Sequence, residues 1–313
     1  MAQENIGILI TDEKILLSQV SLSEKNELTV KYCEQRSVAG DNPKDVMKAV
    51  VQELQLEGEP CVLCLNPEEY EVFLIPELEK DAKKKDSNPD KAKLRSTVAQ
   101  LLEYTIEEAS IDYIPLPKPL GDQSPMAYIV AARESLIQRK LDIVQESGLV
   151  PWAVDIPEMA MRNLYQRFRG ADKNRLIVHL LPGQSKIVKV QSDTIEMMRN
   201  CDMNTAWIFQ DEITPEMIAS GLTSLVTTIA GEIERSVNYS ETMLGQAHVD
   251  EIVIVSNSHA MDQVLTELKS RSPIVINAVS IEEHLKMASA ANRAHLYRAA
   301  FSIGAALRER GKA

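Results

Sequence analysis

The residues of this chain whose spacing best suits redox or metal chemistry are Cys61 and Cys64, a Cys-x-x-Cys pair. Both lie in the aliphatic segment PCVLCLN, which has the composition of a buried strand. Because residues i and i+3 of a strand point to opposite faces, the two thiols cannot reach one metal ion or each other. We therefore expect buried structural thiols, and four cysteines are too few for a disulfide scaffold.

Histidines and short catalytic motifs offer no better candidate. The five histidines show no metal-ligand spacing, so no metal site is predicted, and His179 lies in an aliphatic segment that indicates a core residue. The motifs G-x-x-x-x-G-K-[ST], G-x-G-x-x-G, H-E-x-x-H and G-x-S-x-G are all missing from the sequence. Phosphate-loop, dinucleotide-binding, zinc-protease and serine-hydrolase chemistry are therefore not expected.

Charge and hydropathy exclude further classes of partner. The net charge of −12 and an aromatic content of 4% argue against nucleic-acid binding, because a negative field repels phosphates. No apolar run reaches the roughly 18–20 residues that span a bilayer. The first ten residues also lack the positive region of a signal peptide. We expect a cytoplasmic protein that reaches a membrane only through a partner.

A repeated order of elements organises the chain. Strands are expected at 6–10, 14–20 and 27–33, followed by a helix from Asn42 and a strand at 61–65. The same β-β-β-α-β order returns with strands at 176–181, 185–191 and 194–199, a long helix ending near Leu244 and a strand at 252–255. This duplication predicts a two-lobed α/β protein with a ligand crevice between the lobes.

The region between the repeats has its own pattern. Residues 94–156 predict an α-β-β-α-β unit, a small subdomain inserted in the first lobe. We expect a first lobe over 1–169 and a second over 175–313, with a closing helix over 288–309 that packs back toward the first lobe. On the long helix, Glu232, Arg235 and Tyr239 share the flank of an apolar stripe, where a helix can line a cleft.

Three segments of the chain resemble the PilM family of type IV pilus assembly proteins, and most closely its MshI branch in MSHA pilus biogenesis. They are AYIVAARESLIQRKLDIVQESGLVPWAVDIPEMAMRNL at 127–164, AGEIERSVNYSETML at 230–244 and RAAFSIGAALRE at 298–309. The resemblance implies a two-lobed actin-like ATPase fold, a duplicated βββαβα unit with an inserted subdomain. It also implies binding to the N-terminal tail of a bitopic, PilN-type inner-membrane protein. The cytoplasmic part of the type II secretion protein GspL is similar in fold.

In this family the tail docks near the inserted subdomain, so the resemblance implies contacts from 111–119 and 127–133. An extended tail would add to a strand edge or lie in a groove there. A second copy of the chain and a pilus motor ATPase remain open as further partners. The candidate contact residues are Ile111, Tyr113, Ile114, Leu116, Tyr128, Val130 and Arg133.

Well-studied members also bind ATP between the lobes, but this sequence departs from their pattern. Leu9 stands where actin-like ATPases have an acid that orders Mg²⁺, and Asp12 and Glu13 would repel a polyphosphate from the following turn. Pro182 removes a backbone donor from the matching turn of the second lobe. If a nucleotide binds, the candidates are Thr11, Asp12, Lys14, Gly183, Ser185, Glu232, Arg235, Ser256 and Asn257.

We therefore expect a non-catalytic scaffold without a cofactor. Two alternatives stay open: an active ATPase that binds ATP and Mg²⁺ between its lobes, and a GspL-like adaptor of type II secretion. A sugar-kinase-like enzyme is a third, but it lacks a candidate base beside a phosphate turn. A saturable rise in melting temperature with Mg-ATP would favour the ATPase.

Overall fold

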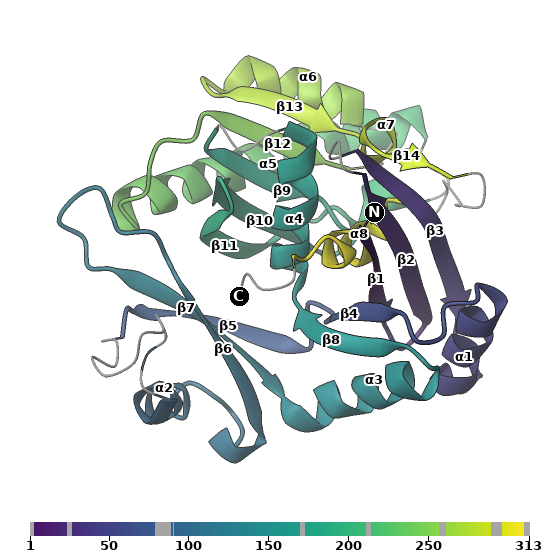
Figure 1. Ribbon diagram of the computed structural model, residues 1–313. Helices are drawn as coiled ribbons and strands as arrows, with labels where there is room; N and C mark the ends of the chain where they lie inside the picture. The colour runs from purple at the N-terminus through teal and green to yellow at the C-terminus, as the bar shows by residue number, and fades with distance from the viewer. Residues whose placement is uncertain are drawn as a thin grey trace.

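The computed structural model describes residues 3–23, 27–78, 89, 91–169, 173–210, 214–256, 261–288 and 296–309. These residues form two large sheets, one at the upper centre of Figure 1 and the other at its right and lower centre, and a smaller sheet at the lower left. None of the helices in these ranges is long and apolar enough to cross a membrane.

The first large sheet has the order β14-β3-β2-β1-β4-β8. An antiparallel meander forms its first part, and β4 and β8 add parallel to β1. The sheet begins with a strand from far along the chain, because β14 pairs with β3. The bounds are β1 (Gln3–Ile10), β2 (Lys14–Leu22), β3 (Leu28–Ser37), β4 (Pro60–Cys64), β8 (Val150–Asp155) and β14 (Lys286–Met287).

The second large sheet repeats this pairing with the order β11-β10-β9-β12-β13. Its first three strands are an antiparallel meander and its last two are parallel to β9, so the predicted duplication is confirmed. The bounds are β9 (Arg175–His179), β10 (Gln184–Gln191), β11 (Thr194–Asp202), β12 (Glu251–Val255) and β13 (Val275–Val279).

Capped helices connect the third and fourth strands of each repeat. The helix α1 (Pro43–Glu53) begins at Asn42, whose side chain accepts a hydrogen bond from the Lys44 N–H. The helix α5 (Pro215–Asn238) begins at Thr214, which caps the Met217 N–H, and it ends in the π-helical turn η3 (Tyr239–Met243). Proline at the first helical position, where no N–H is needed, favours both starts.

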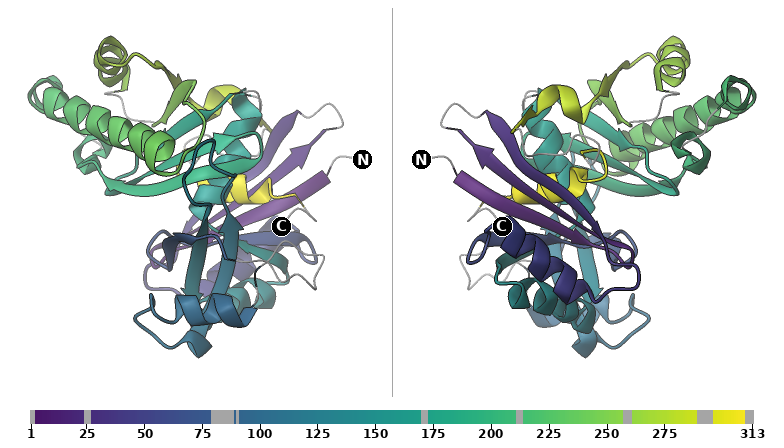
Figure 2. Two further views of the ribbon diagram at one scale, coloured as in Figure 1. Left: turned by 90° about the vertical axis from the view of Figure 1, so that its left-hand side faces the viewer. Right: turned by 90° about the vertical axis from the view of Figure 1, so that its right-hand side faces the viewer.

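The inserted subdomain has an antiparallel sheet of order β5-β7-β6, with bounds β5 (Tyr70–Pro76), β6 (Ala109–Pro115) and β7 (Met126–Arg133). The helix α2 (Lys91–Val98) contributes Val98 to the core on one face of this sheet, and η1 (Ile106–Glu108) precedes β6. In Figure 2 the β6–β7 hairpin extends toward the second lobe.

These bounds correct the predicted insert of 94–156. The strand β5 belongs to the subdomain although it ends before residue 94, and β8 belongs to the first large sheet because it pairs with β4. The first helix of the predicted unit is also short, since it ends at Val98, well before β6 begins at Ala109. The helix α3 (Glu134–Glu146) leads back from β7 to β8.

Two helices pack against each other between the large sheets, as Figure 1 shows: α4 (Pro157–Arg169) and α8 (Ala300–Ala306). A Cβ on Gly304 would lie 2.2 Å from the Ala160 carbonyl oxygen, and one on Gly7 would lie 1.8 Å from that of Ser302. Only glycine permits backbones to approach this closely. The closing helix predicted over 288–309 therefore covers 300–306, while 289–295 lie outside the described residues.

Shorter elements complete the second lobe, namely η2 (Ala206–Phe209), α6 (Met261–Arg271) and α7 (Ile281–His284). The largest core cluster includes Leu9 of the first lobe, Val130 of the insert and Ile254 of the second lobe. The three sheets therefore share one continuous core.

Candidate functional site

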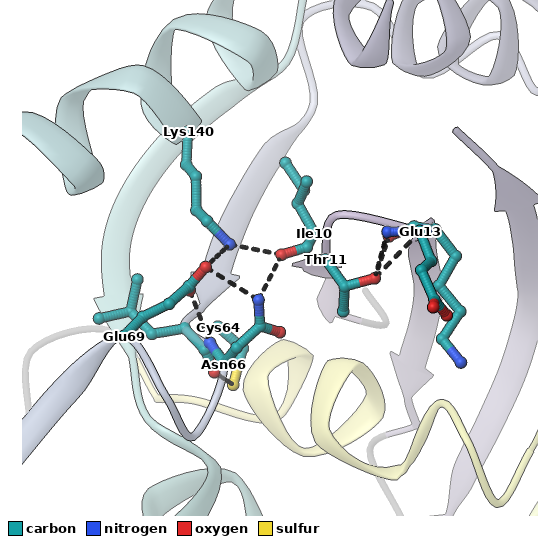
Figure 3. Close-up of polar contacts among 9 residues, drawn as sticks. Ile10, Thr11, Glu13, Cys64, Asn66, Glu69 and Lys140 are labelled. Atoms are coloured by element: carbon teal, nitrogen blue, oxygen red, sulfur yellow. Dashed lines mark hydrogen bonds and ion pairs between the residues drawn. The ribbon is translucent and has the colours of Figure 1, made fainter. Parts of the chain in front are cut away.

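The turn between β1 and β2 is closed by its own side chain (Figure 3). The Thr11 Oγ1 accepts hydrogen bonds from the N–H groups of Glu13 at 3.3 Å and Lys14 at 3.0 Å. The Thr11 N–H donates to the Lys14 carbonyl at 2.9 Å. Three backbone donors that a phosphate would need are therefore already used, and Asp12 and Glu13 project into solvent.

A lysine fills the space at the end of β1. Figure 3 shows the Lys140 ammonium between the Ile10 carbonyl, to which it donates a hydrogen bond, and Glu69, with which it forms an ion pair at 2.6 Å. Asn66 donates from Nδ2 to the same carbonyl at 2.8 Å and to Glu69 Oε1 at 2.9 Å. Sequence patterns do not predict this cluster, because α3 brings Lys140 to residues about 70 and 130 positions earlier.

The matching turn of the second lobe is also closed. The Ser185 Oγ accepts from the Leu181 N–H at 3.3 Å, and the Thr205 hydroxyl donates to the Leu181 carbonyl. Pro182 has no N–H, and Gly183 adopts a left-handed φ of 94°. Ser185 and Gly183 therefore form part of a turn whose Leu181 N–H is already hydrogen-bonded within the chain.

His179, before this turn, is a core residue as predicted. It is fully buried, and the aromatic rings of Tyr165, Tyr297 and Phe301 pack against it edge-on. Burial lowers its pKa to about 3, so the imidazole is neutral at physiological pH. Tyr297 also shares a side-chain hydrogen bond with Ser256.

On α5 the predicted pair of Glu232 and Arg235 is in contact, at 2.5 Å. Arg199 of β11, which the sequence analysis missed, completes the group through Glu232 at 3.3 Å and the Ser236 hydroxyl at 2.7 Å. The hydrogen bond from Arg235 lowers the pKa of Glu232. Tyr239 begins the π-helical turn that follows. Asn257, the last nucleotide candidate, lies outside the described residues.

These groups do not fit a magnesium-bound triphosphate. The donors of both turns are bonded within the chain, and Lys140 places a fixed cation at the end of β1. In the part of the chain that the structure describes, no group of three His, Cys, Asp or Glu residues is arranged to hold a metal ion. Cys61 and Cys64 lie in different core clusters on the two faces of β4, as predicted, and all four cysteines are free and buried.

A pocket of about 660 Å³ lies instead beside the inserted subdomain. Its walls are β6, the end of β8 and the start of α4, with Arg308 from the chain's last described segment. Of the predicted partner contacts, Ile111, Tyr113, Ile114 and Val130 line this pocket.

The other three predicted contacts lie elsewhere. Leu116 and Tyr128 are buried in the main core. They share the sheet face of Ile114 and Val130, because side chains two positions apart on a strand point the same way, but they lie farther along the β6–β7 hairpin, toward the second lobe. Arg133 is on the surface, where it stacks 4.0 Å above the ring centre of Tyr104 and pairs with Glu108 at 3.0 Å.

The strand β6 presents an open edge at this pocket. It is the last strand in the order β5-β7-β6, so within the described residues only β7 pairs with it. The Tyr113 N–H donates to Asp112 Oδ1 at 2.9 Å and therefore points away from β7. Because these directions alternate along an antiparallel strand, the backbone of Ile111 also faces outward. Peptide groups at an unpaired edge bind extended chains.

The β6–β7 hairpin is attached to the second lobe by hydrogen bonds. The Leu120 N–H donates to the Gly245 carbonyl at 2.7 Å, and the Gln246 side chain donates to the Pro117 carbonyl at 3.1 Å. A buried cluster joins the lobes at a second point, where Lys186 of β10 contacts Glu158 of α4 at 2.6 Å. Tyr70 of β5 donates to the same carboxylate at 2.5 Å.

Comparison with known proteins identifies the fold. No protein-family model and no curated protein matches the sequence. Among solved structures, a PilM-PilN type IV pilus biogenesis complex is similar with a TM-score of 0.70, 15% identity and 97% of each chain covered. A protein with an actin-like ATPase fold and unknown function from Bacteroides thetaiotaomicron has a TM-score of 0.48 and 10% identity, with 95% of each chain covered.

The cytoplasmic domain of EpsL, an inner-membrane component of the type II secretion system of Vibrio cholerae, has a TM-score of 0.45 and 9% identity, with 87% of this chain and 97% of that chain covered. The duplicated sheets and the likeness over nearly the whole chain agree. The chain has an actin-like fold of the PilM-like kind.

Proposed function

We propose that this protein is a non-catalytic cytoplasmic scaffold of type IV pilus assembly that binds the N-terminal tail of a PilN-type inner-membrane protein. The observation that carries the proposal is the pocket beside the open edge of β6. The proposal includes an MSHA-type pilus as the system that the scaffold serves, as the sequence resemblance to the MshI branch implies.

The pocket suits an extended peptide. An added strand would bond to the outward backbone groups of Ile111 and Tyr113, after displacing the Asp112 carboxylate from the Tyr113 N–H. Its side chains would meet the apolar wall of Ile114, Val130 and Met159. Main-chain bonds supply affinity in this mode, and alternate side-chain pockets supply selectivity.

The closed turns support a role without ATP hydrolysis. A phosphate would have to displace the Thr11 hydroxyl from two backbone N–H groups, and a metal ion would meet the Lys140 ammonium. The contacts of the β6–β7 hairpin and of Lys186 also oppose the opening of the lobes that a nucleotide cycle requires. A scaffold with a fixed groove needs neither a bound nucleotide nor an opening of the lobes.

The test is calorimetric titration with a synthetic peptide of the N-terminal tail of the PilN-type protein from the same genome. Ile114→Arg places a charge in the pocket and is expected to weaken binding at least tenfold, by about 1.4 kcal/mol. Val275→Arg is the matched control, because Val275 is also an aliphatic residue on an edge strand but lies on β13 of the second lobe.

The proposal is abandoned if the tail does not bind, or if both variants bind it as the wild type does. A thermal-shift titration with Mg-ATP on the same sample tests the ATPase alternative. We expect no saturable rise in melting temperature, and a rise would favour the alternative.

A further inference from the structure

A side chain of β6 itself occupies a hydrogen-bond donor at the open edge of this strand. The Asp112 Oδ1 accepts a hydrogen bond from the Tyr113 N–H at 2.9 Å, where an added strand would offer a carbonyl oxygen. Asp112 is exposed and lines the pocket. Aspartate side chains that bond to nearby backbone groups compete with strand pairing for the same donors. In the free protein the carboxylate therefore takes the place of a bound peptide at this donor.

A second aspartate at the pocket makes the same kind of local bond but is held in place. The Asp155 Oδ1 accepts from the Ile156 N–H at 3.0 Å, and Arg308 forms an ion pair with this oxygen at 3.0 Å. Asp155 is 3% exposed, so breaking these contacts would leave a buried charge without a partner. The exposed carboxylate of Asp112 would instead be hydrated once it is displaced. Of these two aspartates, Asp112 is the one that can give way to a peptide carbonyl.

The displacement of Asp112 weakens the binding of every extended segment equally. Main-chain hydrogen bonds of an added strand do not depend on its sequence. A strand must break the bond between Asp112 and Tyr113 before it can bond to that donor. Charged side chains protect edge strands from unwanted pairing in this way. Selectivity must then come from side chains of the tail that contact the apolar wall of Ile114, Val130 and Met159.

We propose that Asp112 is a competitive blocker of the β6 edge. It occupies the Tyr113 N–H in the free protein, is displaced by the tail, and restricts binding to segments whose side chains also fill the apolar wall of the pocket. This inference rests on the proposed function and adds to it a residue that lowers affinity. A residue that only contacts the tail would have the opposite effect when it is shortened to alanine.

The test is calorimetric titration of the synthetic PilN-type tail on four full-length proteins: the wild type, Asp112→Ala, Asp112→Asn and Asp122→Ala. Asp112→Ala removes the acceptor, so the tail should bind about tenfold more tightly, by about 1.4 kcal/mol. Asp112→Asn keeps an amide oxygen that accepts the Tyr113 N–H less strongly, so its increase should stay below about threefold. Asp122→Ala is the matched control, because Asp122 is also an exposed aspartate of the β6–β7 hairpin but lies in its loop.

Two further measurements separate a freed backbone donor from other effects. The same tail with one apolar residue replaced with alanine should gain affinity on Asp112→Ala by the same factor as the unchanged tail, because the freed donor is a backbone group. Hydrogen–deuterium exchange needs no peptide. The Tyr113 amide should exchange faster in Asp112→Ala than in the wild type and in Asp122→Ala, because it has lost its acceptor.

The outcomes separate the two proposals. Tail binding that is unchanged or weaker on Asp112→Ala, or that increases equally on Asp112→Ala and Asp112→Asn, would overturn the role of Asp112 and leave the tail-binding proposal intact. A tail that binds none of the four proteins would overturn the tail-binding proposal. The exchange rate of the Tyr113 amide would then decide the role of Asp112, and equal rates in the wild type and Asp112→Ala would overturn it.

Discussion

Tyr128 of β7 and Met198 of β11 are joined across two sheets. The Met198 N–H donates to the Tyr128 hydroxyl at 3.0 Å, and the same hydroxyl lies 3.4 Å from the Met198 carbonyl. Because β11 is the last strand of its sheet, this tyrosine satisfies edge groups that would otherwise be buried without partners. The inserted subdomain is thus bonded directly to the second lobe.

Tyr128→Phe should therefore destabilise the protein although it removes a single oxygen. The buried backbone groups of Met198 lose their partner, and we expect the free energy of unfolding to fall by about 1–3 kcal/mol. Chemical denaturation measures this. Tyr32→Phe is the control, because Tyr32 is a half-buried tyrosine on β3 of the first lobe. Equal losses in the two variants would contradict the assigned role of Tyr128.

Gly304→Ala should show how closely α8 and α4 pack. The added methyl group would lie 2.2 Å from the Ala160 carbonyl oxygen, so the helices must move apart, with an expected loss of about 2 kcal/mol or more. Gly231→Ala should instead raise the free energy of unfolding. The nearest atom to its Cβ would be the end of the flexible Arg235 side chain, at 3.4 Å, and alanine favours the α5 helix by about 0.5–1 kcal/mol. Thermal unfolding of both variants checks the prediction.

His179 should make stability depend on pH. Its folded pKa of about 3 lies below the unfolded value of 6.5, so the unfolded state binds the extra proton between these values. Stability should then fall as the pH decreases through 6.5 toward 3, by up to about 1.4 kcal/mol per pH unit.

His179→Leu should remove this slope, which urea denaturation at pH 7 and pH 5 measures. His248→Gln is the control, because the side chain of His248 is 91% exposed. A wild-type slope that His179→Leu leaves unchanged would show that His179 does not cause it.

Lys140→Met should destabilise the end of β1. Glu69 would remain largely buried with only the Asn66 donors, and breaking such a pair is unfavourable by about 3 kcal/mol. The double variant Lys140→Met/Glu69→Gln removes the unpaired charge and should be more stable than Lys140→Met alone. A double-mutant cycle in urea gives the coupling energy, and a value near zero would exclude a structural role for the pair.

Local patterns in the sequence predicted the duplicated sheets, because strand length, turn residues and a helix cap such as Asn42 are local properties. They also predicted the opposite faces of Cys61 and Cys64. The bounds of the insert were wrong because strand pairing is non-local. The pairing of β5 with β7, and of β8 with β4, joins segments about 55 and 90 residues apart.

The candidate sites were predicted less well for the same reason. Asp155 meets Arg308 only after the chain returns from the second lobe, and the Thr11 hydroxyl closes its turn through a rotamer that composition does not reveal. Tyr128 and Val130 share one face of β7, but Tyr128 contacts Met198 of the second lobe while Val130 reaches the pocket, a difference that strand alternation does not predict. The resemblance indicated the part of the chain where the pocket lies, but not which of its side chains line the pocket.

The last elements of the chain complete the first sheet, since β14 pairs with β3 and the Ser302 hydroxyl of α8 lies 2.8 Å from that of Ser18 on β2. A ribosome releases these residues long after it has synthesised β1, β2 and β3. The amino-terminal half therefore leaves the exit tunnel with one face of its sheet uncovered until α8 has been synthesised. We expect chaperones that shield apolar surface to bind the nascent chain at this stage.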